Sequence, residues 1–322
     1  GTVSHYTREP RRLSEAQEQR IQARKVIQGG FGSIRPDTTA DQAKISVTQA
    51  GLSYLKGSDI SAVLGIPEQS LKSIIKSNLL SLSTQGRKVA YFTDTETSGI
   101  YFYARGIESP YTRKNIYWLK KEKGSPMATV EGKAPSPPGG DENFTETLHF
   151  EEDHYSAPAL LRDPSADYWF WDYIVSGDPA MGSRTFTLRA DGVSTTPGNA
   201  SLSVRFFGAT NTSVSGEHNA TITLNGTTIG QTQWQGTTDH TATFTFSRQL
   251  LNDGDNTLMI TGILGPGIPY SIFYINSFEL TYQRLYQAVG NSLLFRGDTN
   301  QVVTVSGFSN PDILLLEVSD PD

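Results

Sequence analysis

Cysteine is absent from all 322 residues of the chain. Its absence excludes disulfide bonds, thiolate metal sites and catalysis by a cysteine nucleophile within this chain. No apolar run approaches the roughly 18 residues that suggest a membrane-spanning helix, and the first residues lack the apolar core of a secretory signal. A membrane span is therefore not expected.

Residues that favour strands are plentiful. The chain holds 15 Phe, 14 Tyr and 4 Trp, and its hydrophobic fraction of 36% is enough to build sizeable cores. Aromatic and β-branched residues favour strands, whereas Ala, Leu, Glu and Lys favour helices. We therefore predict a mainly β protein, and the length predicts two or three domains.

Charge is unevenly distributed around a net value of −6. Residues 1–36 carry seven Arg and Lys against three Glu, and residues 141–172 carry nine Asp and Glu against one Arg. Such segments can pair within one chain, or the acidic one can bind a cation. Nucleic acid is not an expected partner, because the basic residues are few and accompany no recognised motif.

Composition divides the chain into five segments. The only long amphipathic helix is predicted over residues 14–28, after an extended basic arm over 1–12, and Gly29-Gly30 ends it. A segment with four Pro and four Gly is predicted to be a linker. The predicted segments are the arm and helix (1–36), a small β-rich domain (37–123), the Pro/Gly linker (124–143), a jelly-roll β-sandwich (144–284), and further β-strands leading towards a domain beyond this chain (285–322).

Short β runs recur at regular spacing in the predicted sandwich, among them "RTFTLRA", "ASLSVRFFG", "TATFTF" and "NTLMITG". In "HNATITLNGTTIGQTQWQG", Asn225-Gly226 permits a type I′ hairpin turn. Asn256 is placed to tie a turn to the strand that follows it. Trp234 comes after this hairpin, in a polar stretch that predicts an exposed position. The spacing of strands and turns predicts a jelly-roll sandwich.

Acidic side chains provide the candidate metal ligands. His149 and His154 flank "FEED", but alternation along a strand would place them on opposite faces, so a transition-metal site is not favoured. Calcium is favoured over zinc, because the loops of this region are rich in oxygen ligands. A structural calcium ion is predicted near Glu151, Asp153 and Asp239, and no other cofactor is expected.

Three tryptophans are candidate ligand-binding residues. Trp169 and Trp171 fall on one face of "DYWFWDYI" if that segment is a single strand, and Trp234 follows the predicted hairpin. Exposed indole rings can stack on sugars, although such rings more often pack in interiors. For Trp234 we favour packing or domain docking. No context selects a carboxylate pair and no G-x-S-x-G elbow is present, so no catalytic residue is predicted and the chain is expected not to be an enzyme.

Two resemblances to known families narrow these alternatives. "ITLNGTTIG", followed by a tryptophan and "LLNDGDNTLMI", resembles the galactose-binding-like jelly rolls appended to many hydrolases. A series of motifs resembles the region that precedes the catalytic domain in gingipain-type bacterial cysteine peptidases. The series, in chain order, is "AKISVTQAGLSYL", "GIYFYARGIESPYTRKNIYWLK", "FEEDHYSAP", "DYWFWDYI", "FELTYQRLY" and "VSGFSNPDILLLEVSDP". This second resemblance covers residues 43–322 and leaves the basic arm and helix outside.

The resemblance implies a non-catalytic accessory region of a secreted peptidase, acting in folding, restraint or substrate docking of a downstream peptidase domain. It also implies an extracellular or cell-surface location in a bacterium. An alternative is a carbohydrate- or cell-surface-binding module. A third is a structural surface or filament subunit that self-associates through the arm, because an extended segment can add a strand to a neighbour's sheet.

Overall fold

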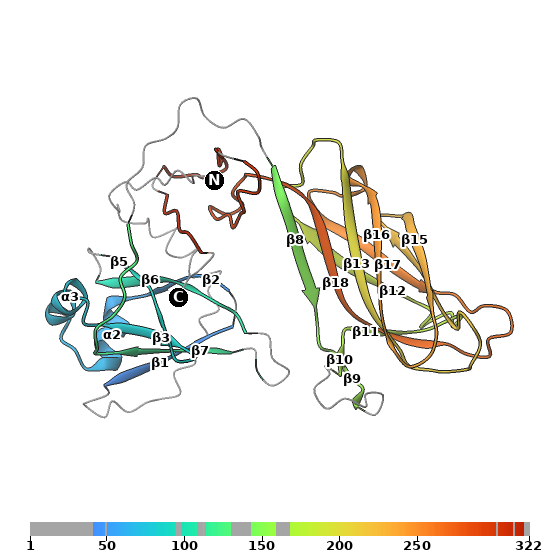
Figure 1. Cartoon of the computed structure of the whole chain (residues 1–322), viewed down its shortest axis with the longest axis horizontal. Coiled ribbons are helices and arrows are strands. Elements are labelled where there is room, and N and C mark those ends of the chain that lie inside the picture. The colour runs from blue at the N-terminus through green and yellow to red at the C-terminus, as the bar shows by residue number, and fades with distance from the viewer. Residues whose placement is uncertain are drawn as a thin grey trace. The chain divides into compact units, whose positions relative to one another are not determined.

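The computed structural model describes residues 41–48, 50–94, 98–107, 112, 114–129, 143–158, 168–300, 302–311 and 313–318. The predicted arm (1–12) and helix (14–28) lie outside these residues. The chain divides into two compact units. We call them the N-terminal unit, with described residues of 41–129 and 310–318, and the sandwich unit, with those of 143–309. Both consist mainly of strands (Figure 1), which confirms the predicted mainly β class.

The N-terminal unit contains two antiparallel sheets and two short helices. The larger sheet has the strand order β1-β7-β3-β4, and the smaller has the order β2-β6-β5. The strands are β1 (Gln42–Val47), β2 (Gly51–Leu55), β3 (Ser81–Thr84), β4 (Arg87–Val89), β5 (Phe92–Asp94), β6 (Gly99–Ala104) and β7 (Asn115–Lys120). The helices α2 (Gly57–Leu64) and α3 (Glu68–Lys76) lie between β2 and β3 in the sequence.

One hydrophobic core holds the N-terminal unit together. Leu64 of α2 and Leu71 and Ile75 of α3 are almost completely buried in it, together with the inward side chains of both sheets. The hydroxyl of the fully buried Tyr91 donates a hydrogen bond of 2.6 Å to the backbone oxygen of Leu80. The unit therefore buries its polar tyrosine tip without leaving it unpaired.

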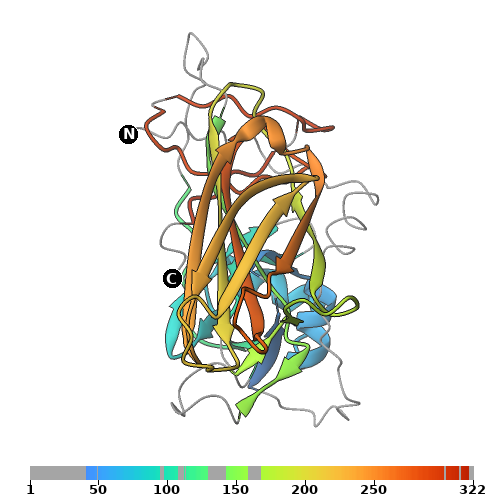
Figure 2. The ribbon, with the colours of Figure 1, turned by 90° about the vertical axis from the view of Figure 1, so that its right-hand side faces the viewer.

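The sandwich unit is built from two larger antiparallel sheets and one small one (Figures 1 and 2). The order β12-β17-β14-β15 forms the four-stranded sheet, and β11-β18-β13-β16, with β8 also paired to β18, forms the five-stranded sheet. The elements are β8 (Asn143–Glu151), β9 (Tyr155–Ser156), β10 (Trp169–Phe170), β11 (Asp172–Val175), β12 (Ser183–Ala190), β13 (Asn199–Gly208), β14 (His218–Leu224), β15 (Thr227–Trp234), β16 (Asp239–Ser247), a 3₁₀ turn (Arg248–Leu250), β17 (Gly254–Gly262) and β18 (Ile272–Leu285).

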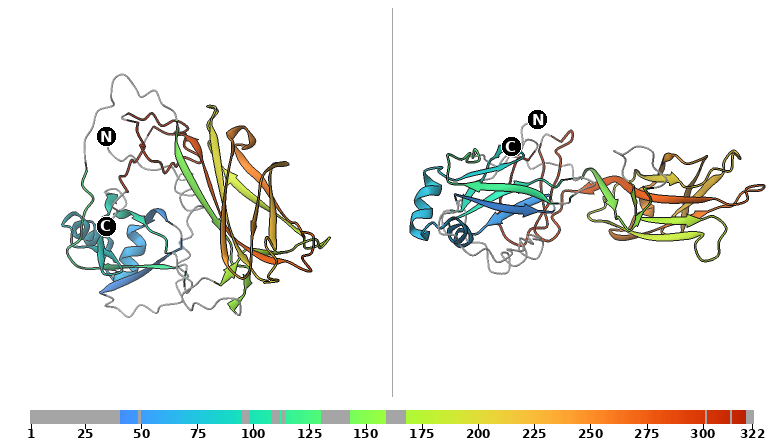
Figure 3. Two further views of the ribbon diagram at one scale, coloured as in Figure 1. Left: turned by 45° about the vertical axis from the view of Figure 1, so that its right-hand side comes forward. Right: turned by 90° about the horizontal axis from the view of Figure 1, so that it is seen from below.

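Strand β18 organises the five-stranded sheet. It runs for 14 residues and pairs with β13 along one side. Along its other side it pairs first with β11 and then with β8, so two strands share one edge. Figure 3 shows β18 running the length of the unit. The small β9-β10 sheet lies beside the end of β18 that pairs with β11.

The core of the sandwich unit follows from strict alternation. In β14, for example, His218, Ala220, Ile222 and Leu224 are completely buried, and the residues between them are partly exposed. Inward residues of the two large sheets interdigitate, as in other β-sandwiches. Polar threonines and serines occupy most of the alternate positions. This alternation is the pattern from which the strands were predicted.

The predicted hairpin at Asn225-Gly226 is confirmed. Asn225 (φ 47°) and Gly226 (φ 81°) both have the positive φ that a type I′ turn requires. The buried side chain of Asn256 accepts hydrogen bonds from the Asn225 side chain and the Asn252 backbone, both at 2.8 Å. It donates to the backbone oxygens of Asn252 and Gly254, both at 3.0 Å. Asn256 therefore ties the turn to β17, as its position in the sequence predicts.

The described residues after β18 are irregular. Two isolated bridges, Gln287 with Ser306 and Val289 with Ser292, are the β-structure found there. The buried Tyr286 packs against Phe144 with ring centroids 4.9 Å apart, which fastens this segment to the start of β8. Neither helix in the described residues is long and apolar enough to cross a membrane.

Candidate binding surfaces

The end of the sandwich where β13, β15 and β17 finish contains a buried polar cluster. His218 is completely buried, and its Nδ1 lies 2.9 Å from the Ser271 hydroxyl and its Nε2 lies 3.3 Å from the Thr210 backbone oxygen. Because a carbonyl oxygen can only accept, Nε2 carries the proton and Nδ1 of the neutral ring accepts from Ser271. These bonds join β14 to the two loops that follow β13 and β17.

Glu217 lies beside this histidine and is also fully buried. Its Oε2 accepts a hydrogen bond of 2.9 Å from the Thr212 backbone N–H, and its Oε1 has no partner among the described residues. Burial lowers the pKa of His218, although the negative charge of Glu217 acts in the opposite direction. Burial, together with the charge of His218, also lowers the pKa of His240. The cluster therefore favours neutral histidines.

Trp234 lies in the core of this end and not on the surface. Its side chain is 8% exposed, and its indole stacks on Phe206 of β13 at 5.0 Å and on His240 of β16 at 4.7 Å. The edge of Phe273 from β18 completes the contact at 5.0 Å. The predicted exposure of Trp234 is wrong, because β15 ends with this side chain turned between the two sheets. This burial agrees with the packing role favoured for Trp234 and leaves no exposed indole face for the alternative ligand platform.

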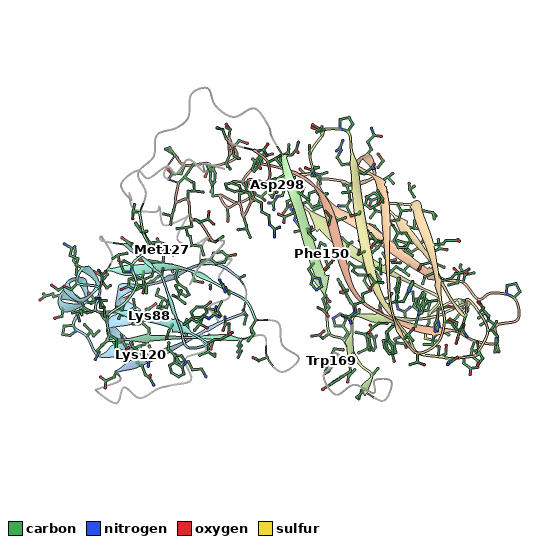
Figure 4. The ribbon with its side chains drawn as sticks, in the orientation of Figure 1. Lys88, Lys120, Met127, Phe150, Trp169 and Asp298 are labelled. Carbon is green, nitrogen blue, oxygen red and sulfur yellow. The ribbon has the colours of Figure 1, made fainter. Side chains whose placement is uncertain are left out.

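Trp169 and Trp171 do not share a face. The strand predicted over "DYWFWDYI" is interrupted at Trp171, between β10 and β11. The Trp171 ring packs at 5.2 Å from both Phe186 and Phe278 of the main core. Trp169, paired with Ser156 of β9, remains half-buried at the tip of the unit (Figure 4). The two tryptophans therefore form no common platform.

The tip around β9 and β10 is rich in tyrosine. Phe170 is buried against Tyr274, with ring centroids 4.6 Å apart. The exposed Tyr155 meets Tyr173 edge to face at 5.2 Å. We call Tyr155, Tyr168, Trp169 and Tyr173 the aromatic tip.

A second candidate surface is the connection between β17 and β18, which we call the apolar loop (residues 263–270). Ile263, Leu264 and Tyr270 are 39%, 40% and 53% exposed, although each is a large apolar or aromatic residue. Ile268 is buried and anchors the loop, and the Ile263 N–H donates to the Asn219 backbone oxygen at 2.8 Å. At the centre of the loop, Gly265-Pro266-Gly267 is a typical turn sequence. The apolar residues on both sides of it were the signal that a surface lies here.

The predicted calcium ligands are not brought together. Glu151 lies on β8 with His149 Nε2 3.0 Å from its Oε2, whereas Asp239 begins β16 and pairs with Arg205 at 3.3 Å. Two strands, β18 and β13, separate β8 from β16, which is a span of about 14 Å at the usual strand spacing. One ion cannot bridge that span. Across the described residues, no group of three or more His, Asp or Glu side chains could hold a metal ion.

Comparison with known proteins shows a likeness in fold and none in sequence. No family model and no curated protein matches the chain. A crystal structure of dimeric latent PorU from Porphyromonas gingivalis is similar to it, with a TM-score of 0.59 and 13% sequence identity. The likeness covers 83% of this chain and 27% of PorU, so the chain spans about a quarter of that protein's length.

Carbohydrate-binding modules also resemble part of the chain. One is a module of the type CBM36 in complex with calcium and xylotriose, with 11% identity over 42% of this chain and 98% of the module. Another is the CBM36-1 domain of a multidomain xylanase from the hindgut metagenome of Trinervitermes trinervoides, with 10% identity over 42% of this chain and 96% of that domain. Both TM-scores are 0.26, too low to support an inference about this chain.

Proposed function

We propose that this chain is a non-catalytic accessory region of a secreted, gingipain-type bacterial peptidase, and that it docks on the peptidase domain and restrains it. The observation that carries the proposal is the fold likeness to latent PorU, which extends over 83% of the chain. The absence of cysteine from the whole chain is consistent with it, because the nucleophile of such a peptidase must then lie elsewhere. The location that follows is extracellular or on the cell surface.

The apolar loop is the surface best suited to docking. Exposed apolar side chains on a well-anchored loop gain free energy when a partner covers them, and contiguous patches of this kind commonly mark interaction sites. If the two parts belong to one polypeptide, the tether raises their effective concentration, so a small surface is sufficient. Ile263, Leu264 and Tyr270 would form the centre of such a contact.

The test adds the separately produced chain to a gingipain-type peptidase domain and follows hydrolysis of a chromogenic peptide. The wild-type chain should slow hydrolysis in a saturable manner. Leu264→Asp should weaken this effect at least tenfold, because it places a charge at the centre of the contact. Leu294→Asp is the matched control, since Leu294 is 60% exposed and lies outside the apolar loop.

Two results would contradict this proposal. One is a rate of hydrolysis that does not change with any concentration of the chain. The other is an equal loss of inhibition in the Leu264→Asp and Leu294→Asp variants, which would show that the apolar loop is not the contact. Circular dichroism of each variant verifies that the sandwich unit has folded.

A carbohydrate-binding module is the second candidate function, and the half-buried Trp169 of the aromatic tip favours it. Neighbouring tyrosines give the tip the amphipathic character that sugar rings contact. Glycan-array binding that is lost in Trp169→Ala and kept in Trp171→Phe would support this function. Binding that survives Trp169→Ala would remove the tip from consideration.

Two further predictions test the structural-subunit alternative and the predicted calcium ion. Self-association through the arm predicts that the chain elutes as an oligomer in size-exclusion chromatography and that deletion of residues 1–12 gives a monomer. A monomer in both cases would contradict a structural-subunit function. A structural calcium ion predicts that EDTA lowers the melting temperature and that calcium restores it, and an unchanged melting temperature would exclude the ion.

A further inference from the structure

Charge separates sharply between the two units. Residues 41–129 carry twelve Lys and Arg against seven Asp and Glu, and nine of the twelve are lysines. Residues 143–309 contain no lysine and carry seven Arg against fifteen Asp and Glu. The N-terminal unit is therefore the cationic part of the described chain, and its lysines supply most of the positive charge.

Three of these lysines lie on one face of the larger sheet of the N-terminal unit. One row of paired residues across this sheet is buried and therefore faces the core. The row runs from β1 through β7 and β3 to β4 and consists of Ala43, Leu119, Leu82 and Val89. The alternate positions must therefore point to the opposite face. Those positions are Gln42, Lys44, Ser46, Ser81, Ser83, Lys88, Ile116, Trp118 and Lys120.

Trp118 lies at the centre of this face. Register places Lys44 on β1 and Ser83 on β3 directly beside it, and Lys88 on β4 follows Ser83 in the same row. Lys120 is two residues along β7 from Trp118. At usual spacings, Lys44 is about 5 Å, Lys120 about 7 Å and Lys88 about 10 Å from Trp118, measured between backbones. We call Lys44, Lys88, Trp118 and Lys120 the basic face.

The side chains of the basic face are available to a ligand. Lys44 and Lys88 are exposed, and Trp118 and Lys120 are half-buried. The Lys88 ammonium group donates to the Lys123 backbone oxygen at 2.9 Å, which leaves two of its three N–H groups. No carboxylate occupies an outward position of these four strands. Figure 4 shows Lys88 and Lys120 on this sheet.

We propose that the basic face binds an anionic polysaccharide in which acidic groups recur from one sugar unit to the next. The indole of Trp118 offers a flat ring for a sugar ring to lie on. Lysines on both sides of it would pair with carboxylate or sulfate groups as point charges, and Ser83 would supply a hydroxyl. This sheet face holds only Trp118 and Ile116 as large apolar residues at its outward positions. It therefore suits a polymer strand better than a folded acidic protein, whose docking needs a larger desolvated centre.

Affinity electrophoresis in native gels containing sodium alginate, a polyuronate, tests this binding, with neutral dextran and poly-L-glutamate in parallel gels. We expect alginate to retard the full chain and neutral dextran not to. Lys44→Gln with Lys88→Gln should weaken retardation about fivefold, because two exposed ion pairs are lost. Trp118→Ala should weaken it about tenfold, because an aromatic stack is lost.

The matched control is Lys72→Gln with Lys76→Gln, which removes the same charge from exposed positions of α3. Retardation that is unchanged in this control and reduced in the basic-face variants would support the proposal. Equal loss in both double variants would overturn it, because net charge would then suffice. Poly-L-glutamate binding as strong as alginate binding and insensitive to Trp118→Ala would also overturn it, in favour of an acidic polypeptide. No retardation by alginate would overturn it outright. None of these results depends on the peptidase proposal.

Discussion

Replacing Trp234 with alanine should destabilise the sandwich unit by about 3–5 kcal/mol. The side chain is 8% exposed and its ring contacts the rings of Phe206 and His240, so nearly all of its surface is removed from water by folding. About 200 Å² of buried surface at roughly 25 cal/mol per Å² gives about 5 kcal/mol. Partial collapse of the surrounding side chains reduces this value.

Replacing Trp234 with phenylalanine separates packing from hydrogen bonding. The indole Nε1 of Trp234 is buried and has no partner among the described residues. Leaving such a donor unpaired costs about 1–3 kcal/mol, and phenylalanine removes that cost while it retains most of the ring contacts. We therefore expect Trp234→Phe to destabilise the unit by about 1 kcal/mol, far less than Trp234→Ala.

Urea unfolding followed by far-ultraviolet circular dichroism measures both effects without relying on tryptophan fluorescence. Trp169→Ala is the control, since this half-buried ring at the tip should contribute about 1 kcal/mol or less. A Trp234→Ala variant within 1 kcal/mol of the wild type would refute the buried position of the indole. Equal costs for Trp234→Phe and Trp234→Ala would refute the unpaired Nε1.

Three further predictions follow from the same unit. Because burial lowers the pKa of His218, the folded state resists its protonation; stability is therefore fully present above the unfolded pKa of about 6.5 and falls as pH drops below it, by up to about 1.4 kcal/mol per pH unit. Urea unfolding at pH 7.5 and 5.5 should show this loss, and His218→Gln should reduce it. Asn256→Ala should cost about 3 kcal/mol, because its buried side chain makes four hydrogen bonds, whereas Asn252→Ala, at an exposed position, should be nearly neutral in the same assay. Gly208→Ala should lower the melting temperature, because its Cβ would collide with the Gly236 backbone oxygen and the His218 ring.

Each of these predictions has a contradicting result. A pH dependence that is identical in His218→Gln and the wild type would assign acid instability to other groups. Equal costs for Asn256→Ala and Asn252→Ala would show that the Asn256 hydrogen bonds contribute nothing net. An unchanged melting temperature in Gly208→Ala would mean that the backbone there moves easily, contrary to the close packing at this end of the sandwich.

Local sequence signals predicted the strands and one turn well. Alternation in "HNATITL" corresponds to β14, and Asn225-Gly226 forms the turn because only residues that tolerate positive φ fit there. Asn256 was identifiable because an amide side chain after a glycine turn can bond to nearby backbone groups. These features depend on residues close together in the sequence. That is why they could be recognised without the structure.

Features that depend on the bends of strands and on packing between sheets could not be recognised in this way. Alternation assigns Trp169 and Trp171 to one face only if the strand is continuous, and after the interruption at Trp171 its half-buried ring packs against the core. The surroundings of Trp234 in the sequence are polar, yet its neighbours in space are aromatic residues from four other strands. Helix α3 was not predicted, although Leu71 and Ile75 have helical spacing, because its remaining residues are polar and the segment is short.

The pairing of β18 has a consequence for the order in which the chain can fold during synthesis. β18 lies inside the five-stranded sheet, yet it is the last strand of the unit to be made. Until β18 is made, β8 and β11 lack the strand with which they pair, and one side of β13 is unpaired. Such non-local pairing slows folding and exposes strand edges meanwhile. A nascent chain would therefore need protection from aggregation until β18 is made, and truncation before residue 272 would leave it permanently in that state.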